Sequence, residues 1–416
     1  MRLVTFCVWF RRAAPFVVVG LLFGVVRLLA AGFVQSEFAI GLWVPPRSDG
    51  DFASRYREIA GANFNLVVAN SVPDAARQLE LCQAAGLYAL LEVTGPVEQY
   101  PQGEGCWGYH LMDEPGAGSF AGLAQRVESL RRLRAGRLAY INLFPNYASP
   151  SQLGTQSYEE YVHRFVTEVK PEVLCMDHYP FMRPDRDTRE AYLANLETLR
   201  LQANAAGIPF WNYFNSMPFG EHSDPTEAQI RWQVNASLAH GAKGVLYFCY
   251  WTPGKGAGGK GEFPKGGAIL TAEGIRTRHY DEARRINGEL KNLGPTLMNL
   301  TGNGVVRVRA TASASDSPRG MGLVRVGILP GDPPANLLLG SLSHRDGRRA
   351  LMVVNHDHSY TCWPTLRFDV PVSLVREVDR STGLEMVPVD SSPELEGFQC
   401  SLGAGDARLF LFPRRE

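Results

Sequence analysis

Two acidic residues close an apolar run of the kind that forms a buried strand. The run Trp107–Pro115 reads WGYHLMDEP and carries Asp113 and Glu114 near its end. A Glu at the mouth of an apolar strand loses part of its hydration, which raises its pKa toward the value that a general acid needs. A structural interpretation competes, because an acid just before Pro115 can cap the following helix. We expect Glu114 to be the general acid. For Asp113, both a role in the site and a role as a helix cap stay open.

Seven further apolar runs end in polar or aromatic residues that suit a sugar ligand. Amide groups can bind hydroxyl groups, and flat aromatic rings can stack on a sugar face. Aromatic residues in strands are usually core residues, so some of these rings are expected to be structural. Trp43 and Trp251 are the predicted walls of the site. The predicted substrate-binding residues are Trp43, Glu92, His110, Asp113, His178, Tyr179, Asn212, Asn215, Tyr250 and Trp251.

Asp177 is the predicted second carboxylate. Cleavage of a glycosidic bond needs one carboxylic acid and one carboxylate that acts as nucleophile or general base. Asp177 follows the apolar residues Val173–Met176 and precedes aromatic ones. Its structural alternative is an acid that binds a neighbouring arginine or backbone amide. Glu92 and Glu262 are weaker candidates, since Glu92 can pair with a basic residue and Glu262 lies in a glycine-rich loop.

The histidines give no metal or cofactor signature. Alternation places His110 on the same strand face as Glu114, and His178 is next to Asp177, but a single strand histidine is commonly a core residue. The sequence has no HExxH, no HxH in the first run and no GxSxG motif. We therefore predict no cofactor. A metal-dependent hydrolase remains an alternative that would require three converging ligands.

The elements that position these residues follow the pattern of a (β/α)₈ barrel. Eight short apolar runs alternate with stretches of helical periodicity over about 260 residues. An open doubly wound sheet is the alternative, but no GxGxxG or P-loop follows the first run. We interpret the glycine-rich stretch Gly254–Gly267 as an active-site loop and not as a phosphate cradle. The eight runs are Phe38–Val44, Phe64–Asn70, Leu87–Val93, Trp107–Pro115, Leu138–Pro145, Glu172–Pro180, Ile208–Asn215 and Lys243–Trp251. The predicted helices include 74–85, 119–133, 158–169, 188–206 and 226–240.

The fourth run resembles the acid/base strand of the glycoside hydrolase superfamily with (β/α)₈ catalytic barrels. The closing part, from Gly241 through LYFCYWTP to Tyr280, is similar to its beta-galactosidase-like members. The resemblance implies a glycosidase acting on an oligosaccharide or polysaccharide, with Glu114 as acid/base. It also implies a nucleophilic Glu at the end of the seventh strand. The sequence has amides there, in Ile208–Asn215, and the next acid is Glu221. This departure keeps open a non-catalytic carbohydrate-binding barrel.

The chain is predicted to begin with an export segment over residues 1–36. Arg11 and Arg12 precede the apolar stretch Ala13–Val34, which is interrupted by Arg27 and contains the small residues 30–32. This is the pattern of a signal peptide and predicts an exported, periplasmic or extracellular protein. An uncleaved membrane anchor is the main alternative, which would associate the protein with a membrane. A buried helix of a globular domain is the third interpretation of this stretch.

Residues 37–300 form the predicted barrel, and residues 301–416 a predicted β-sandwich domain. The second region has short alternating runs separated by turn residues, which is typical of an all-β domain. Lysine plus arginine and aspartate plus glutamate each total 42, so the net charge is zero and nothing indicates a nucleic-acid partner. The seven cysteines form no CxxC motif, although Cys362 and Cys400 could pair.

Overall fold

The computed structural model describes residues 32–47, 50–184, 186–254, 263, 267–313, 315–316 and 320–414. Most of the predicted export segment, and most of the loop Gly254–Gly267 with Glu262, lie outside these residues. Within the described part of the chain, no helix combines the length and apolar character needed to cross a membrane.

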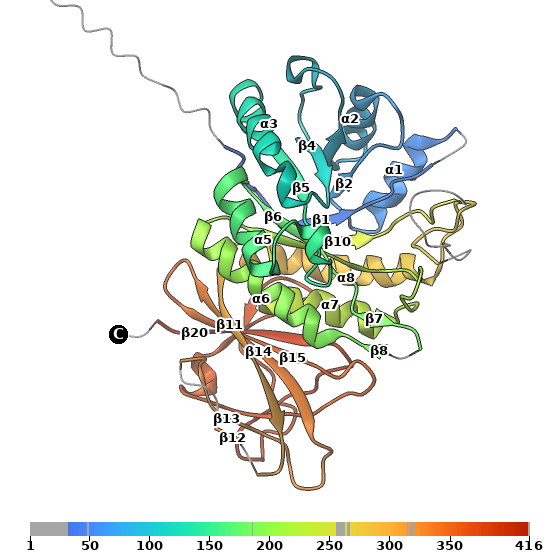
Figure 1. The fold of residues 1–416 in the computed structure, drawn as a ribbon. Helices are drawn as coiled ribbons and strands as arrows, with labels where there is room; N and C mark the ends of the chain where they lie inside the picture. The colour runs from blue at the N-terminus through green and yellow to red at the C-terminus, as the bar shows by residue number, and fades with distance from the viewer. Residues whose placement is uncertain are drawn as a thin grey trace, which may run out of the picture.

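The first domain is a closed barrel of eight parallel strands, which confirms the predicted fold class (Figure 1). The strands follow the order β5-β4-β3-β2-β1-β10-β9-β6. A parallel bridge between Leu143 and Met176 joins the β5 side to the β6 side and completes the ring. The strands are β1 (Ala39–Leu42), β2 (Leu66–Val68), β3 (Tyr88–Glu92), β4 (Cys106–Asp113), β5 (Leu138–Asn142), β6 (Leu174–Asp177), β9 (Phe210–Asn215) and β10 (Gly244–Phe248).

Helices surround the barrel and begin where the sequence offers caps. The Thr226 side chain accepts a hydrogen bond from the backbone N–H of Gln229, and the Gln229 side chain accepts one from the backbone N–H of Thr226. This capping box starts α7. The helices are α1 (Phe52–Gly61), α2 (Ala75–Ala84), α3 (Phe120–Leu133), α4 (Pro150–Leu153), α5 (Tyr158–Arg164), α6 (Arg189–Ala206), α7 (Glu227–Ala239) and α8 (Arg278–Leu297). A π-helical turn, η3 (Phe165–Val169), continues α5.

The third repeat departs from the expected strand-then-helix pattern. After β3 the chain forms only a short 3₁₀ turn, η1 (Val97–Gln99), before it enters β4. The connecting sequence contains Gly95, Pro96, Pro101, Gly103 and Gly105. Proline lacks a backbone donor and glycine favours the unfolded chain, so this composition disfavours a helix.

The barrel interior is filled by side chains at alternate strand positions. Leu138 and Tyr140 of β5 and Trp211 and Tyr213 of β9 pack in one buried cluster inside the ring. Because side chains of a strand alternate between faces, the next inward positions are Asn142 and the last residue of β9. The inner strand ends therefore hold polar groups above an aromatic core.

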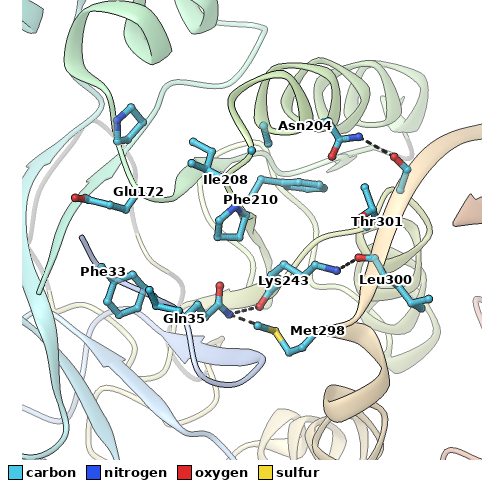
Figure 2. Close-up of a pocket in the computed structure, with 17 residues that line it drawn as sticks. Phe33, Gln35, Glu172, Asn204, Ile208, Phe210, Lys243, Met298, Leu300 and Thr301 are labelled. Atoms are coloured by element: carbon cyan, nitrogen blue, oxygen red, sulfur yellow. Dashed lines mark hydrogen bonds between the residues drawn. The ribbon is translucent and has the colours of Figure 1, made fainter. Parts of the chain in front are cut away.

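The residues before β1 close the opposite, N-terminal end of the barrel. The Phe33 ring lies 5.6 Å from that of Trp107. The Gln35 side chain accepts a 2.9 Å hydrogen bond from Trp211 Nε1 and donates a 2.7 Å bond to the Lys243 carbonyl (Figure 2). We call residues 33–37 the plug, because Phe33 covers Trp107 and Gln35 hydrogen-bonds to Trp211 and Lys243 at the N-terminal end of the barrel core.

The second domain is an all-β sandwich, as predicted. A six-stranded sheet has the order β11-β14-β15-β20-β17-β18, and a four-stranded sheet has the order β12-β13-β16-β19. Cys362 and Cys400 are both buried and free. The strands are β11 (Leu300–Ala310), β12 (Ser315–Asp316), β13 (Leu323–Gly327), β14 (Ala335–His344), β15 (Arg349–Asn355), β16 (Thr365–Phe368), β17 (Arg376–Val378), β18 (Glu385–Met386), β19 (Phe398–Gln399) and β20 (Ala407–Phe412). A separate hairpin in the barrel pairs β7 (Phe181–Met182) with β8 (Arg186–Asp187).

The central strands β14 and β15 of the six-stranded sheet are buried on both faces. Leu337 and Leu339 of β14 face the sandwich core, whereas Leu338 packs into the core of the barrel domain. Helices α6 and α7 lie between the barrel and this sheet (Figure 1). The contact is close at Gly340, where an added Cβ would lie 2.5 Å from the Ala239 carbonyl oxygen. The domains thus form an extensive packed interface.

Candidate active site

Three carboxyl groups meet at the C-terminal ends of the barrel strands. Asp113 ends β4, Glu114 follows it, and Asp177 ends β6. Asn142 ends β5, which lies between them. Its Nδ2 donates to Asp113 Oδ1 at 3.1 Å and to Asp177 Oδ1 at 2.9 Å. This is the end of a (β/α)₈ barrel where active sites lie. We call Asp113, Glu114 and Asp177 the acid cluster.

Glu114 occupies a strained backbone conformation. Its φ is +45°, in the left-handed region that non-glycine residues rarely adopt. The Glu114 N–H donates to the Asn142 carbonyl at 2.9 Å, and the Tyr161 hydroxyl donates to the next carbonyl, of Pro115, at 2.7 Å. Such strain costs about 1–3 kcal/mol and is concentrated at functional sites. Two hydrogen bonds thus hold Glu114 in a conformation that its residue type disfavours, and the helix-cap interpretation is not needed to explain it.

The acid cluster binds protons more tightly than ordinary carboxyl groups. Burial, followed by the charges of Asp177 and Asp113, raises the pKa of Glu114 to about 8. Burial and then Asp113 raise the pKa of Asp177 to about 7, although hydrogen bonds from Asn142 and Tyr179 act against this shift. Asp113 remains in contact with solvent, but desolvation by the surrounding protein also raises its pKa. At neutral pH the cluster therefore holds a proton on Glu114.

Glu114 and Asp177 interact directly, carboxyl to carboxyl. The protonated Glu114 side chain hydrogen-bonds with Asp177, which contributes to its raised pKa. Asp177 is 9% exposed, so little water competes for this interaction. Like-charged carboxylates in contact cannot both ionise readily, so such a pair shares a proton. This is the arrangement of a group poised to donate that proton to a ligand.

A second group of predicted residues lies beside the cluster. The Trp43 ring contacts the His110 ring edge-on at 5.1 Å and that of Tyr213 at 5.5 Å. His110 Nδ1 lies 3.8 Å from Glu92 Oε1. Glu92 and His110 also line a cavity of about 830 Å³ next to the ends of β2 and β3. Glu92 and His110 therefore border a space that can hold a sugar-sized ligand, and Trp43 packs against His110 beside it.

An aromatic wall completes the other side of the mouth. The Tyr179 ring lies 5.3 Å from Phe248, 5.2 Å from Phe219 and 5.4 Å from His222. Burial, followed by the charge of Asp177, raises the pKa of Tyr179, and Tyr179 hydrogen-bonds with Asp177. Tyr179 is only 7% exposed, so it connects the acid cluster to the partly exposed rings of Phe219, His222 and Phe248, which are the ones available for stacking.

Two of the predicted substrate-binding residues form hydrogen bonds outside the barrel instead of at the acid cluster. Asn212 lies outside the barrel, where its Nδ2 donates to Tyr192 Oη at 2.6 Å on α6 and to Ser237 Oγ at 3.1 Å on α7. His178 also faces outward, with Nδ1 3.0 Å from Asn195 Oδ1, and burial lowers its pKa to about 4. The structure does not bring Asn212 or His178 into the acid cluster.

Asn215 occupies the inward-facing end of β9 but is engaged by its own loop. Its backbone N–H donates to Gln233 Oε1 at 3.0 Å, and its Nδ2 donates to the Ser223 carbonyl at 3.2 Å. Asn215 Oδ1 accepts from the Met217 N–H at 3.2 Å. These bonds use the amide for loop structure. Glu221, the next acid along the chain, is exposed and pairs with Arg186 at 2.9 Å.

Tyr250 and Trp251 are core residues in this structure. Trp251 is only 4% exposed, with Arg55 over its ring at 5.3 Å and Gly274 packed against it. Tyr250 is fully buried beside Phe64. Neither ring offers an open face to a sugar, and the expected wall at Trp251 is instead supplied by Phe248 and its neighbours.

A second cavity, of about 720 Å³, lies at the plugged end of the barrel. Phe33, Gln35, Glu172, Phe210 and Lys243 are among its lining residues (Figure 2). It is separated from the acid cluster by the length of the barrel core. None of the acid-cluster residues lines this cavity.

No group of metal-binding side chains is formed by the described residues. Although three carboxyl groups converge, no set of three or more His, Cys, Asp or Glu side chains in this part of the chain could hold a metal ion. The predicted metal-dependent alternative required such a set.

Sequence reasoning did not select Asn142, Tyr147, Phe219, His222 or Phe248 as site residues. Asn142 could have been selected, because it ends the fifth run at an inward position. Phe248 also faces inward, two residues before Tyr250. Phe219 and His222 lie in the loop after β9, where no periodicity predicts their direction.

Comparisons with known proteins place the fold among glycoside hydrolase structures. No family model and no curated protein sequence matches the chain. The beta-galactosidase from Bacillus circulans sp. alkalophilus is similar with a TM-score of 0.56 and 10% identity, over 91% of this chain and 99% of that one. The beta-galactosidase from Marinomonas ef1 has a TM-score of 0.47 and 12% sequence identity, over 62% of this chain and 60% of that one. A family 39 glycoside hydrolase from Bacteroides cellulosilyticus WH2 has a TM-score of 0.43 and 14% sequence identity, over 90% of this chain and 81% of that one. This chain thus spans 60% of the length of the Marinomonas enzyme, and it shares its fold with the Bacillus one.

Proposed function

We propose that the protein is a glycoside hydrolase that cleaves O-glycosidic bonds with Glu114 as general acid. One observation carries this proposal: the partly buried Glu114 carboxyl, whose pKa is raised to about 8 by burial and by the neighbouring acids, interacts with the Asp177 carboxyl at the C-terminal end of the barrel. A glycosidase needs one protonated and one ionised carboxyl group on the scissile bond. The fold likeness is compatible with this chemistry but does not assign it.

In the proposed reaction, Glu114 donates its proton to the leaving glycosidic oxygen. That oxygen replaces Asp177 as the partner of the Glu114 proton. Asp177, once it loses this hydrogen bond, faces the developing positive charge of the sugar as a carboxylate, as nucleophile or as base for a water. Its hydrogen bond from Asn142 supports the ionised form.

The separation of the two carboxyl groups decides the stereochemistry of the proposed reaction. Retaining glycosidases hold their carboxyl groups about 5 Å apart and inverting ones about 6.5–9.5 Å apart. The anomer released by the enzyme therefore reports which separation Glu114 and Asp177 hold when substrate is bound.

The substrate is proposed to lie between Trp43 and Phe248, with the cavity beside Glu92 and His110 holding a further part of the sugar chain. That cavity is lined by polar residues such as Ser71, Asp74 and Glu92, which suits a carbohydrate. Activity toward β-galactosides comes first in the test, because the similar Bacillus structure is a beta-galactosidase.

A non-catalytic carbohydrate-binding barrel is the second candidate. The inward end of β9 supports it, because Asn215 stands where the resemblance implies a nucleophile and is occupied by loop hydrogen bonds. A binder would retain sugars without releasing product.

A panel of aryl glycosides and of plant, algal and bacterial polysaccharides separates the two candidates. Release of aglycone or of reducing ends, absent in an Asp177→Asn variant, supports the enzyme. Saturable sugar binding with no product after prolonged incubation supports the binder and contradicts the proposed reaction.

We also propose that the N-terminal segment exports the protein, on the sequence pattern alone. The packed positions of Phe33 and Gln35 favour a cleavage site before Phe33, a few residues earlier than the predicted boundary at residue 36. N-terminal sequencing of protein recovered from outside the cytoplasm tests this. A mature chain that starts after Glu37, or a full-length chain retained in the membrane, would contradict it.

A further inference from the structure

Asn142 contacts every member of the acid cluster. Its side-chain amide donates to Asp113 and to Asp177, and its backbone carbonyl accepts from the N–H of Glu114. The residue is 2% exposed, so water does not replace these bonds. No other residue described at the mouth hydrogen-bonds to the main chain or side chain of all three acids.

The two N–H groups of this amide make the three acids inequivalent. An N–H donor stabilises a carboxylate oxygen more than it stabilises the protonated acid. Asp113 and Asp177 each receive one such donor, whereas Glu114 receives none from the Asn142 side chain. The proton shared by the cluster is therefore most stable on Glu114.

We propose that Asn142 is a positioning residue that assigns the proton: by donating to Asp113 and Asp177 it favours their carboxylate forms over that of Glu114 and leaves Glu114 as the acid. This inference rests on the proposed function and names how its two carboxyl groups acquire different roles. Without the amide, three similar acids would share the proton, and the fraction of protein with the productive arrangement would fall.

Titratable groups on β3, β4 and α5 and in the segments after β5 and β6 also surround the cluster. Glu92 on β3 and His110 on β4 act on Asp113. Tyr179, after β6, hydrogen-bonds with Asp177. Tyr147, after β5, and Tyr161, on α5, have hydroxyl groups whose pKa values are raised by burial and by these acids. The tyrosines remain protonated over the pH range in which carboxyl groups titrate, so they are constant in the test.

The experiment compares the wild type with Asn142→Leu, which keeps the side-chain size and removes both donors. The pH profile of kcat is measured on a cleaved glycoside. We expect the acid limb to move up by about one pH unit, since loss of a hydrogen bond to a charged group changes a pKa by about that amount. For a limb that moves from about 7 to about 8, kcat should fall about nine-fold at pH 6 but only about two-fold at pH 8, with KM changed less than kcat. Asn142→Ser retains one donor and should shift the limb by less; it also serves if Asn142→Leu does not fold.

Asn146→Ala is the matched control, because Asn146 is also an amide after β5 but donates to the Ala191 carbonyl on α6. Its pH profile should equal that of the wild type. Equal limb positions in wild type and Asn142→Leu, with kcat lowered equally at every pH, would show a purely structural role and overturn the inference.

Carbon-13 NMR titration of the labelled carboxyl groups decides the point independently of activity. If no glycoside is cleaved, the proposed function fails, but the titration still tests Asn142. An Asp177 pKa that rises in Asn142→Leu supports the inference. An unchanged Asp113 and Asp177 titration refutes it.

Discussion

The carboxyl groups of Glu114 and Asp177 interact with each other, although Glu114 follows β4 and Asp177 ends β6, with β5 between them in the closed barrel. Two structural devices bring them together. The left-handed turn at Glu114 directs one acid across the mouth, and Asn142 on β5 holds the other. The contact turns two separate acids into one proton-sharing unit. The predictions below follow from it and from the way the barrel is closed and packed.

The activity should have a narrow, bell-shaped pH profile. The basic limb should lie near the raised pKa of Glu114, about 8, because the acid is lost above it. The acid limb should lie near that of Asp177, about 7, because the second carboxylate is lost below it. Both limbs belong to the coupled pair. Initial rates from pH 4 to 10 measure them, and a flat optimum from pH 4 to 6 would contradict the assignment.

The Asp177→Asn variant should be more stable than the wild type at alkaline pH. The pKa of Asp177 is higher in the folded chain, about 7, than its ordinary value of 3.8. The folded state therefore binds the proton more tightly, and the free energy of unfolding falls as pH rises from about 4 to about 7, at up to about 1.4 kcal/mol per unit. The Tm difference, variant minus wild type, should grow over this window in calorimetry. A constant difference would show that Asp177 is not desolvated.

Loss of the plug should destabilise the barrel. In Phe33→Ala the contact with Trp107 is lost, and because Phe33 is only partly buried we expect a cost of about 1–2 kcal/mol. Val34→Ala is the control, since Val34 is 82% exposed and its loss should change stability by less than about 0.5 kcal/mol. Thermal unfolding measures both. Equal Tm values for the two variants would mean that the plug does not stabilise the barrel.

The interface between the domains should be intolerant of one added methyl group. Gly340→Ala would place Cβ 2.5 Å from the Ala239 carbonyl oxygen, so β14 and α7 would have to separate, at about 1–3 kcal/mol. Gly122→Ala on α3 meets open space and should stabilise the protein by up to about 1 kcal/mol. Opposite shifts in the unfolding midpoint are expected. A neutral Gly340→Ala would mean that the sheet can move away from the helix.

The fold was largely predictable because its strands and helices carry strong local patterns. The apolar runs and helical stretches locate the eight strands and helices such as α3 and α7 to within a few residues. The exception is the third repeat, where the prolines and glycines after Glu92 replace a helix by η1. The acids of the site were predictable as well, since strand ends of a parallel barrel meet at one face.

Side-chain direction near the strand ends was harder to predict. Asn212 and Asn215 lie on one apolar run, yet the first faces α6 and the second faces its own loop. Trp251 follows the strand by three residues and turns into the core. Asn212 lies within β9, where alternation with the inward-facing Trp211 and Tyr213 places it outward, whereas Trp251 lies beyond β10, where no alternation fixes the face that a residue joins. Asn142 was a visible strand-end amide, but its role depends on the two acids that surround it in space.

The central claim is that Glu114 donates the proton that cleaves a glycosidic bond. Glu114→Gln keeps the side-chain size and removes the acid, and Glu92→Gln is the matched control at the same mouth. The decisive measurement is kcat of the two variants on a glycoside that the wild type cleaves, with sugar binding followed by calorimetry. We expect Glu114→Gln to lose at least about 10³-fold in kcat with binding retained, within the range for loss of a general acid, about 10²–10⁴, and Glu92→Gln to stay within about ten-fold of the wild type. Near-native turnover by Glu114→Gln would contradict the account.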